Sequence, residues 1–507
     1  MTARAAADRQ AVGLYGGWRR ARGIGLAGLG TGQTFAVLAA VGVVVLAGAT
    51  AVRSLLFLAP ALAAVVAVAL ASWDGVPLVH YAWRRLRWLA TSRRGEIRYQ
   101  GLVAAEHPRA WQLPGVLAQA RLVSAEDGCG GSYGLVWATR TGALTVALRV
   151  AATSIWLANQ AEAASWVAGW GGWLASLGHL PAVRWVGVTV DTAPDPGLTL
   201  QERVERSLDP GAPAAARQIM RQLAVASPQA AADISTWVSI TLDPAALPGN
   251  PVDLLAAAAE VGHALTGLEA ALDGCGLTVL GRASAAELAG AVRAAFDPAV
   301  RGDVNRLLHS TTHPVPAGAV AGDGLLTWGE AAPVAAVELW DRYRHDSGTS
   351  VSWVWREAPR QAVPATVLAR LLTPGPFGAR VTVLYRPLPA AAAGRLLEEQ
   401  VNAAAFHEQW RRRTGRDATA RDATDRARAT QAAVEEAAGA GVTLISLYVT
   451  ATVSDETDLP RAIADVEARA ETAKIRLRRL YGGQAAGFAT TLPCGICPPA
   501  LTARRRR

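Results

Sequence analysis

The stretch LISLYVTATV, residues 444–453, begins the part of the sequence that decides the fold. Its β-branched and aromatic residues are typical of a buried strand. The segments that follow predict a helix over DLPRAIADVEARAETA (458–473), a strand over IRLRRLY (475–481) and a short helix over QAAGFATTL (484–492). This succession of strand, helix, strand and helix predicts an α+β fold with a ferredoxin-like (split βαβ) module.

The same order of segments occurs much earlier in the chain. ISTWVSITL (234–242) and LTVLGRA (277–283) predict two strands, and a long alanine-rich helix lies between them. Each copy ends in a short alanine-rich helix that contains one phenylalanine, Phe296 in the first copy and Phe488 in the second. We therefore predict that the body of the protein consists of duplicated ferredoxin-like cytoplasmic modules.

Two apolar runs lie near the beginning of the chain, over residues 35–52 and 55–71. A helix rises about 1.5 Å per residue, so each run approaches the roughly 30 Å thickness of a hydrocarbon layer. Because only Arg53 and Ser54 separate the runs, they predict an N-terminal transmembrane helical hairpin. A cleavable signal peptide ending near LAGATA and a buried hairpin of a soluble core are the alternatives.

The net charge of +9 is concentrated around these runs, because residues 1–100 hold twelve arginines and three acidic residues. By the positive-inside rule, this pattern predicts a two-pass protein of the cell membrane with both termini in the cytoplasm. Anionic lipids are the expected partners of the flanking arginines. The candidate membrane-surface contacts are Trp18, Arg19, Arg20, Arg22, Trp83, Arg84, Arg85, Arg87, Trp88, Arg93 and Arg94.

Changes in composition divide the rest of the chain into modules and linkers. The predicted segments are a basic cytoplasmic N-terminus (1–34), the two spans (35–71), a juxtamembrane basic segment and linker (72–140), a first α/β module (141–308), a Gly/Pro-rich linker (309–324), a second α/β module (325–497) and a basic tail (498–507). The second module contains a helical or flexible insertion over 390–438, whose middle is rich in charged and small residues and has no apolar stripe.

Several kinds of chemistry find no support in the sequence. The chain has one lysine, Lys474, which does not lie in a glycine-rich phosphate loop. His345, Asp346 and Ser347 are consecutive residues, so they point in different directions and predict a turn rather than a hydrolase triad. We therefore predict no catalytic, cofactor-binding or metal-binding residue, no cofactor and no enzymatic activity. Nucleic acid is expected only as an indirect partner, and direct contact of the terminal arginines (504–507) with DNA is an alternative to a solvated tail.

The motif CGIC places Cys494 and Cys497 two residues apart. A zinc site would need two further Cys or His ligands, and Cys129 and Cys275 are distant and single. A thiol oxidoreductase needs its cysteine pair at the start of a helix, whereas this pair follows a short helix. A membrane-tethered thiol oxidoreductase that uses the pair is kept as an alternative function.

Residues 458–495, DLPRAIADVEARAETAKIRLRRLYGGQAAGFATTLPCG, resemble the end of the N-terminal, non-motor domain of the VirB-type transport ATPases of type IV secretion and conjugation. A Leu-Pro-Gly-type turn ends that domain, and Leu492, Pro493 and Gly495 would form the turn here. YGGWRRARGIGLAGLGTGQT (15–34) and WDRYRHDSGTSVSW (340–353) are similar to an actinobacterial family of two-pass membrane proteins from conjugative or type IV-like secretion loci.

These resemblances imply a non-enzymatic, membrane-anchored scaffold or docking subunit of a type IV-like secretion apparatus. Such a subunit would bind a separate motor ATPase at the cytoplasmic face and would work as a homo-oligomer or in a multi-subunit complex. The E-type membrane subunit of type VII secretion is an alternative, because it also joins two N-terminal spans to a cytoplasmic α/β domain.

Overall fold

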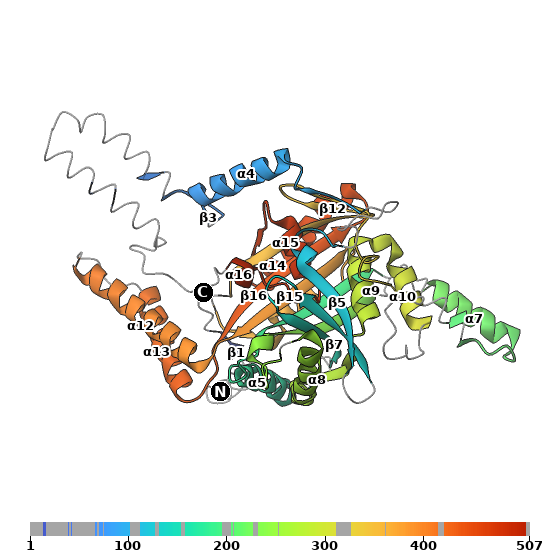
Figure 1. Cartoon of the computed structure of the whole chain (residues 1–507), viewed down its shortest axis with the longest axis horizontal. Helices are drawn as coiled ribbons and strands as arrows, with labels where there is room; N and C mark the ends of the chain where they lie inside the picture. The colour runs from blue at the N-terminus through green and yellow to red at the C-terminus, as the bar shows by residue number, and fades with distance from the viewer. Residues whose placement is uncertain are drawn as a thin grey trace, which may run out of the picture. The chain divides into compact units, whose positions relative to one another are not determined.

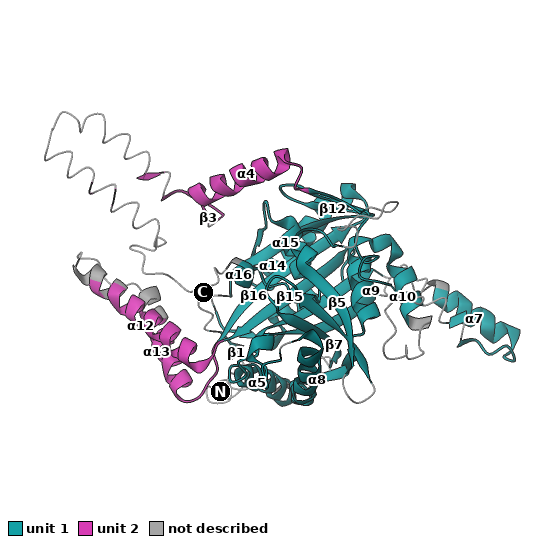
Figure 2. Cartoon of the chain, in the orientation of Figure 1, with its two compact units in different colours: residues 1–16, 98–387, 443–507 teal, residues 17–97, 388–442 magenta. Residues whose placement is uncertain are grey.

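A computed structural model describes most of the chain. The described residues are 14–16, 39, 42, 66–67, 70–74, 76–101, 112–126, 131–153, 158–194, 204–205, 207–226, 232–251, 253–310, 326–359, 361–413 and 420–502. The chain forms two compact units (Figure 2). The first unit comprises residues 1–16, 98–387 and 443–507, and the second comprises residues 17–97 and 388–442.

The first unit is built on one antiparallel sheet of thirteen strands (Figure 1). In the order of neighbours the strands are β4 (Arg98–Gln100), β11 (Ala335–Glu338), β12 (Tyr343–His345), β13 (Gly348–Glu357), β16 (Thr443–Val453), β15 (Gly378–Pro387), β8 (Val183–Pro194), β9 (Ala232–Leu242), β7 (Leu144–Ala152), β6 (Ser132–Ala138) and β5 (Ala120–Glu126). Two further strands pair beside this path, β10 (Leu277–Arg282) with β7 and β17 (Arg476–Arg479) with β13. The α+β class expected from the sequence agrees with this arrangement.

The middle of the sheet consists of two halves with the same succession of elements. The first half is β7, α5 (Gln160–Leu177), β8, β9, α8 (Leu254–Ala270) and β10, and the second is β13, α11 (Ala369–Leu372), β15, β16, α14 (Leu459–Thr472) and β17. Across the sheet, the strands of the first half lie in the order β10, β7, β9, β8, and those of the second half lie in the order β17, β13, β16, β15. In both halves the last strand in sequence therefore lies beside the first, and the third lies between the first and the second. This is the β-α-β-β-α-β succession of a split βαβ module. The halves join into one continuous sheet where β8 pairs with β15, with Val188 opposite Val383.

A short helix follows the last strand of each half, α9 (Ala285–Phe296) in the first and α15 (Gln484–Thr490) in the second. Their phenylalanines, Phe296 and Phe488, are both fully buried, and their ring centroids lie 4.8 Å apart. The two residues that mark the same position in the two copies therefore pack against each other in one apolar cluster.

Each half also carries extra helices between its second and third strands. In the first half this insertion contains α7 (Ala214–Ala226). In the second half it contains α12 (Ala390–Arg413) and α13 (Ala420–Ala437), which belong to the second unit and form a helical hairpin. The backbone N–H of Leu388 donates to the carbonyl of Val442 (2.9 Å) and closes the base of this hairpin. The predicted insertion over 390–438 is thus helical at both ends of the segment.

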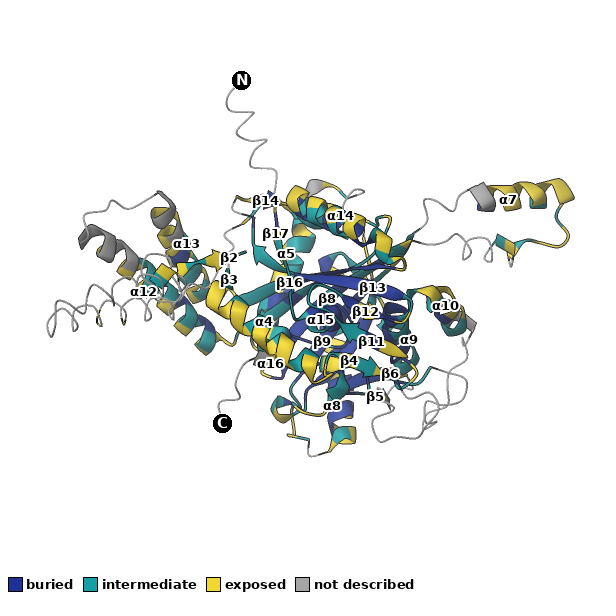
Figure 3. Cartoon of the chain, turned by 90° about the horizontal axis from the view of Figure 1, so that it is seen from above, coloured by how far each residue is buried: buried dark blue, intermediate teal, exposed yellow. Residues whose placement is uncertain are grey.

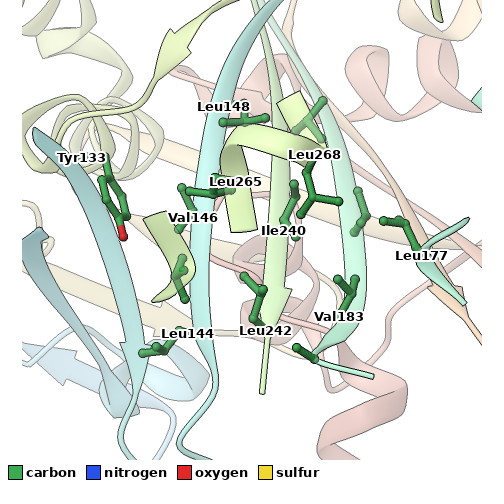
Figure 4. Packing of buried hydrophobic residues seen from close by; sticks show 14 of the residues in the cluster. Tyr133, Leu144, Val146, Leu148, Leu177, Val183, Ile240, Leu242, Leu265 and Leu268 are labelled. Atoms are coloured by element: carbon green, nitrogen blue, oxygen red, sulfur yellow. The ribbon is translucent and has the colours of Figure 1, made fainter. Parts of the chain in front are cut away.

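The largest core lies between the first half of the sheet and helices α5 and α8 (Figure 4). Leu265 and Leu268 of α8 and Leu177 of α5 pack on strand residues such as Val146 and Ile240. The second half has its own core, in which α14 packs on β13 and β16. The other elements whose bounds the described residues define are β1 (Leu14–Tyr15), β2 (Ser72–Trp73), β3 (Val76–Pro77), α4 (Leu78–Arg93), η3 (Gly115–Gln119), η5 (Pro244–Ala246), η6 (Asp273–Cys275), η7 (Pro298–Val300), α10 (Arg301–Ser310), β14 (Val363–Pro364), η8 (Ala365–Leu368), η9 (Glu456–Asp458) and α16 (Pro498–Thr502).

The predicted transmembrane hairpin over residues 35–71 lies almost entirely outside the described residues, which include six positions of this range. Among the residues that are described, no helix combines the length and the apolar character that a membrane span requires. Charge explains this for two of them, because α4 carries four arginines and α12, which has 24 residues, carries seven charged side chains. The structure does not support the transmembrane hairpin or the two-pass localisation with both termini in the cytoplasm, and we withdraw both predictions.

Candidate functional site

The described members of the predicted surface-contact set gather on one helix. Trp83, Arg84, Arg85, Arg87, Trp88 and Arg93 lie on α4, and Arg94 follows it directly. None of the α4 residues is buried, and Figure 3 shows the helix mostly in the colour of exposed residues. The Arg85 guanidinium lies 4.8 Å from the Trp88 ring centroid. Trp18, Arg19, Arg20 and Arg22 lie outside the described residues.

Cys494 and Cys497 lie in the segment that follows α15, and both are buried, free thiols. Burial raises the pKa of Cys494 to about 12. The pKa of Cys497 is also raised, mainly by burial, although the Ala500 backbone N–H and the Arg386 charge oppose the shift. Because the thiolate is the reactive form of cysteine, this environment disfavours the redox chemistry considered for the pair.

We expect both thiols to be protected from alkylation in the folded protein. Iodoacetamide should leave Cys494 and Cys497 unmodified in native buffer and should modify both in urea, because the reagent needs an accessible thiolate. Peptide mass spectrometry after a short exposure measures the modification at each cysteine separately. Rapid modification of either residue in native buffer would favour the thiol oxidoreductase alternative instead.

The segment from Gln484 to Cys497 lies on a face of the sheet that is rich in hydroxyl groups, which we call the hydroxyl layer. Its hydroxyl pairs are Ser350–Thr452 (2.8 Å), Ser352–Thr450 (2.9 Å), Thr189–Thr382 (2.8 Å) and Thr145–Thr241 (2.8 Å). The Thr491 hydroxyl of the covering segment lies 3.0 Å from the Thr450 hydroxyl. The buried hydroxyls thus bond one another across neighbouring strands, which removes most of the cost of burying them.

Gln484 is the first residue of α15, and its side chain makes a hydrogen bond to β13 at a position where no neighbouring strand does. The backbone N–H of Ser352 donates to Gln484 Oε1 (2.7 Å), and the Ser352 carbonyl accepts from the Leu480 backbone N–H (3.0 Å). Ser352 lies on β13 between the stretch paired with β12 and the stretch paired with β17. The Gln484 amide therefore satisfies a backbone group that no strand reaches.

Gly495, the last residue of the turn suggested by the resemblance, has a backbone φ of +69°. Its carbonyl accepts a hydrogen bond from the Trp185 indole Nε1–H (3.1 Å). A Cβ at this position would overlap the Thr145 hydroxyl and lie 2.6 Å from Thr241 Oγ1. Only glycine therefore fits without rearrangement, and the turn is seated directly on the hydroxyl layer.

His345 ends β12, Asp346 and Ser347 form the turn between β12 and β13, and each of the three side chains faces a different partner. His345 Nδ1–H donates to the Phe296 carbonyl (2.5 Å), and His345 Nε2 accepts from Ser350 Oγ (2.7 Å). Asp346 pairs with Arg293 (2.9 Å), and the Ser347 hydroxyl donates to Asp297. Each of the three side chains is engaged in a separate structural contact, so together they do not form the hydrogen-bonded Ser–His–Asp relay of a hydrolase.

The His345 ring is enclosed by the protein, and this changes its ionisation. Burial lowers its pKa to about 4, and the nearby positive charge of Arg380 acts in the same direction. The hydrogen bond to Phe296 and the charge of Asp297 oppose this shift. The ring is therefore neutral at pH 7 and serves as a polar core residue.

Arg380, which is buried, and Arg301, whose side chain is 17% exposed, lie beside the hydroxyl layer. Arg301 of α10 pairs with Asp191 (3.1 Å) and Asp233 (2.8 Å), and these carboxylates raise its pKa despite its burial. Arg380 of β15 is buried, and desolvation lowers its pKa to about 10. Its guanidinium lies 4.6 Å from the Phe488 ring centroid, and its Nε–H donates to Thr491 Oγ1 (3.4 Å). Both arginines therefore tie the sheet to the elements that cover it.

A shallow pocket of about 400 Å³ opens near α14, and it is lined by Asp341, Arg342, Glu456, Leu459, Pro460, Ile463 and Arg479. Arg342 and Arg344 both pair with Glu456 (2.9 and 2.6 Å), and Arg479 pairs with Glu467 (2.9 Å). Because these charges neutralise one another, the pocket offers no uncompensated charge to a ligand. Within the described part of the chain, no three His, Cys, Asp or Glu residues are grouped to hold a metal ion.

Comparison of the chain with protein-family models found no matching family, and comparison with curated proteins found no similar sequence. The family resemblance and the secretion function therefore remain hypotheses that rest on the quoted residues. One exposed apolar face, on α7, was not predicted from the sequence. Its signal was the spacing of Ile219, Met220 and Leu223, which places all three on one side of a helix.

Proposed function

We propose that this chain is a non-enzymatic docking subunit of a type IV-like secretion apparatus and that it binds a separate motor ATPase. The observation that carries this proposal is the apolar face of α7. Ile219, Met220 and Leu223 are 56%, 46% and 56% exposed, although all three are large apolar side chains. Grouped apolar residues of this kind mark interaction surfaces on soluble proteins.

The other side of α7 is polar, which completes the pattern of an amphipathic helix. Arg217, Gln218, Arg221 and Gln222 lie opposite the apolar face, and Arg221 pairs with Glu205 (2.7 Å). A helix with one exposed apolar side fits an apolar groove on a partner protein, where residues three and four positions apart, such as Met220 and Leu223 or Ile219 and Leu223, serve as anchors. Such a surface supports a binding role rather than a catalytic one.

The choice of a motor ATPase as the partner rests on the resemblance of residues 458–495 to the accessory domain of transport ATPases. In those proteins the domain works beside a motor. A homo-oligomer or a larger complex is part of the same proposal, because secretion motors act in multi-subunit assemblies.

We expect a motor ATPase to copurify with the tagged full-length chain from its native host and to be lost with the I219S/L223S variant. The substitutions make the α7 face polar, and they leave the cores intact because both side chains are exposed. The matched control is L255S, which changes a residue of α8 that is 83% exposed. Mass spectrometry of the three preparations measures the ATPase.

Two results would contradict the proposal. One is a parent preparation without any secretion ATPase, and the other is an ATPase that the I219S/L223S variant retains at the parent level. Loss of the ATPase from the L255S control would show that the contact is not specific to α7.

A further inference from the structure

We propose that α4 binds an anionic phospholipid surface by lying on it, with its apolar face among the acyl chains and its arginines at the headgroups. This contact requires no membrane-spanning segment, and it is independent of the docking function proposed above. It rests on the exposure, the charge and the spacing of the residues of α4 and of the β2–β3 hairpin before it.

The apolar face of α4 is open to solvent. Val79, Trp83 and Leu86 are 53%, 66% and 62% exposed, and Leu78 and Leu89 are exposed as well. Successive residues of a helix turn by about 100°, so these five side chains cover one continuous side of the helix. Seven of the eighteen large apolar side chains that are exposed in the described chain lie between Leu70 and Leu89. This concentration distinguishes α4 from scattered surface residues.

The charge of α4 has one sign. Its sixteen residues include Arg84, Arg85, Arg87 and Arg93 and no acidic residue, and Arg94 follows directly. Arg85 and Arg87 flank the apolar face, Arg84 lies on the opposite side of the helix, and Arg93 lies on the same side as the apolar residues, one turn after Leu89. Arginine stems reach along an apolar surface and keep their guanidinium groups in water, which matches the boundary between acyl chains and headgroups.

The hairpin before α4 adds a second exposed tryptophan. Trp73 lies on β2 and is 48% exposed, and its ring meets the Tyr81 ring edge-on with centroids 4.6 Å apart. The backbone N–H of Leu78 donates to the Ala71 carbonyl (2.9 Å), which ties the start of α4 to the residue before the hairpin. Trp73 and Trp83 are thus held beside the start and the middle of the helix, and tryptophan is favoured at membrane–water interfaces.

The charge of α4 also favours an anionic membrane surface over a protein as the binding partner of this face. A groove on a protein partner would accept the apolar residues equally well, but four arginines on a helix that carries no acidic residue call for a surface of dense negative charge. Each basic residue near an anionic bilayer contributes about 1 kcal/mol, which corresponds to about a fivefold change in partitioning. Two arginines should therefore change the partitioning by about twenty-five-fold.

The test is cosedimentation of the purified full-length chain with vesicles of phosphatidylcholine alone or of equal parts phosphatidylcholine and phosphatidylglycerol. We expect binding to the anionic vesicles that weakens with added salt. R85Q/R87Q, which removes the two arginines that flank the apolar face, should weaken it about twenty-five-fold, and W83S/L86S at least about tenfold. The matched control is I219S/L223S, which removes a similar exposed apolar pair from α7 and should bind as the parent does.

All these variants should unfold at the same urea concentration as the parent, because none of the substituted side chains is buried in a core. Equal binding of the parent to both kinds of vesicle would overturn the proposal, as would α4 variants that bind like the parent. An equal loss of binding in the α7 control would also overturn it. Polyglutamate provides a competing acidic polymer. If it displaces the chain from the anionic vesicles, and if W83S/L86S binds polyglutamate as tightly as the parent does, the face would be assigned to an acidic protein instead.

Discussion

Replacement of Gly495 by alanine is expected to lower the free energy of unfolding by about 2–5 kcal/mol. About 1–2 kcal/mol of this comes from placing an L-residue in the left-handed region, and about 1–3 kcal/mol comes from forcing a methyl group into a packed site. The methyl group would overlap the Thr145 hydroxyl and crowd Thr241, which form one of the buried pairs of the hydroxyl layer. Urea unfolding at pH 7 measures the loss.

Gly142 provides the matched control for this prediction. Its φ is +73°, close to that of Gly495, but an added Cβ would have no atom within 4 Å. G142A should therefore lose only the conformational share of about 1–2 kcal/mol. The difference between the two variants isolates the contact of the turn with the hydroxyl layer. If G495A is no less stable than G142A, residues 484–497 do not pack on that layer as described.

Acid is expected to destabilise the protein through His345. The folded pKa of about 4 lies below the ordinary value of 6.5, so the ring must be neutral in the fold and takes up a proton more readily after unfolding. The stability that this group contributes is therefore present above pH 6.5 and is lost as the pH falls toward 4. The shift corresponds to about 3 kcal/mol.

Urea unfolding at several pH values between 7 and 4 tests this expectation. H345Q should be less stable than the parent at pH 7, because it loses part of the contact with Phe296 and Ser350. Its stability should fall less steeply with acid, because the titrating ring is gone. H179Q, which changes an exposed histidine, is the control and should follow the parent. An H345Q curve parallel to the parent curve would show that other groups cause the acid loss.

Local sequence patterns were sufficient to predict the repeated elements of the fold. Alternating β-branched residues marked β9 and β16, and the helix and strand after each had the right type and order. The comparison of Phe296 with Phe488 identified equivalent positions in the two copies. These features depend on residues close together in the chain, so they can be read without knowledge of the tertiary structure.

Features that depend on distant residues could not be predicted in this way. The pairing of β8 with β15 turns two modules into one sheet, and the hydroxyl layer becomes visible only when alternate residues of several strands are brought side by side. Hydropathy and length alone led to the transmembrane prediction, which the described helices do not support.

The candidate site was predicted in part. The sequence grouped Arg84, Arg85 and Arg87 in a basic segment, and the structure puts them on one helix without buried residues, while their contact with a membrane surface stays a prediction. The CGIC motif looked like a chemical site, but burial rather than spacing decides its reactivity. The apolar face of α7 was missed because short alanine-rich helices are usually buried on one side, and exposure is not encoded in spacing.

The central claim, that α7 docks a motor ATPase, is tested most directly by site-specific photocross-linking in the native host. A photoreactive side chain at position 219 samples the apolar face of α7, and the same group at position 255 samples the exposed surface of α8. The account predicts a cross-linked motor ATPase from position 219 and none from position 255. Absence of this product at position 219, or equal amounts from both positions, would contradict it.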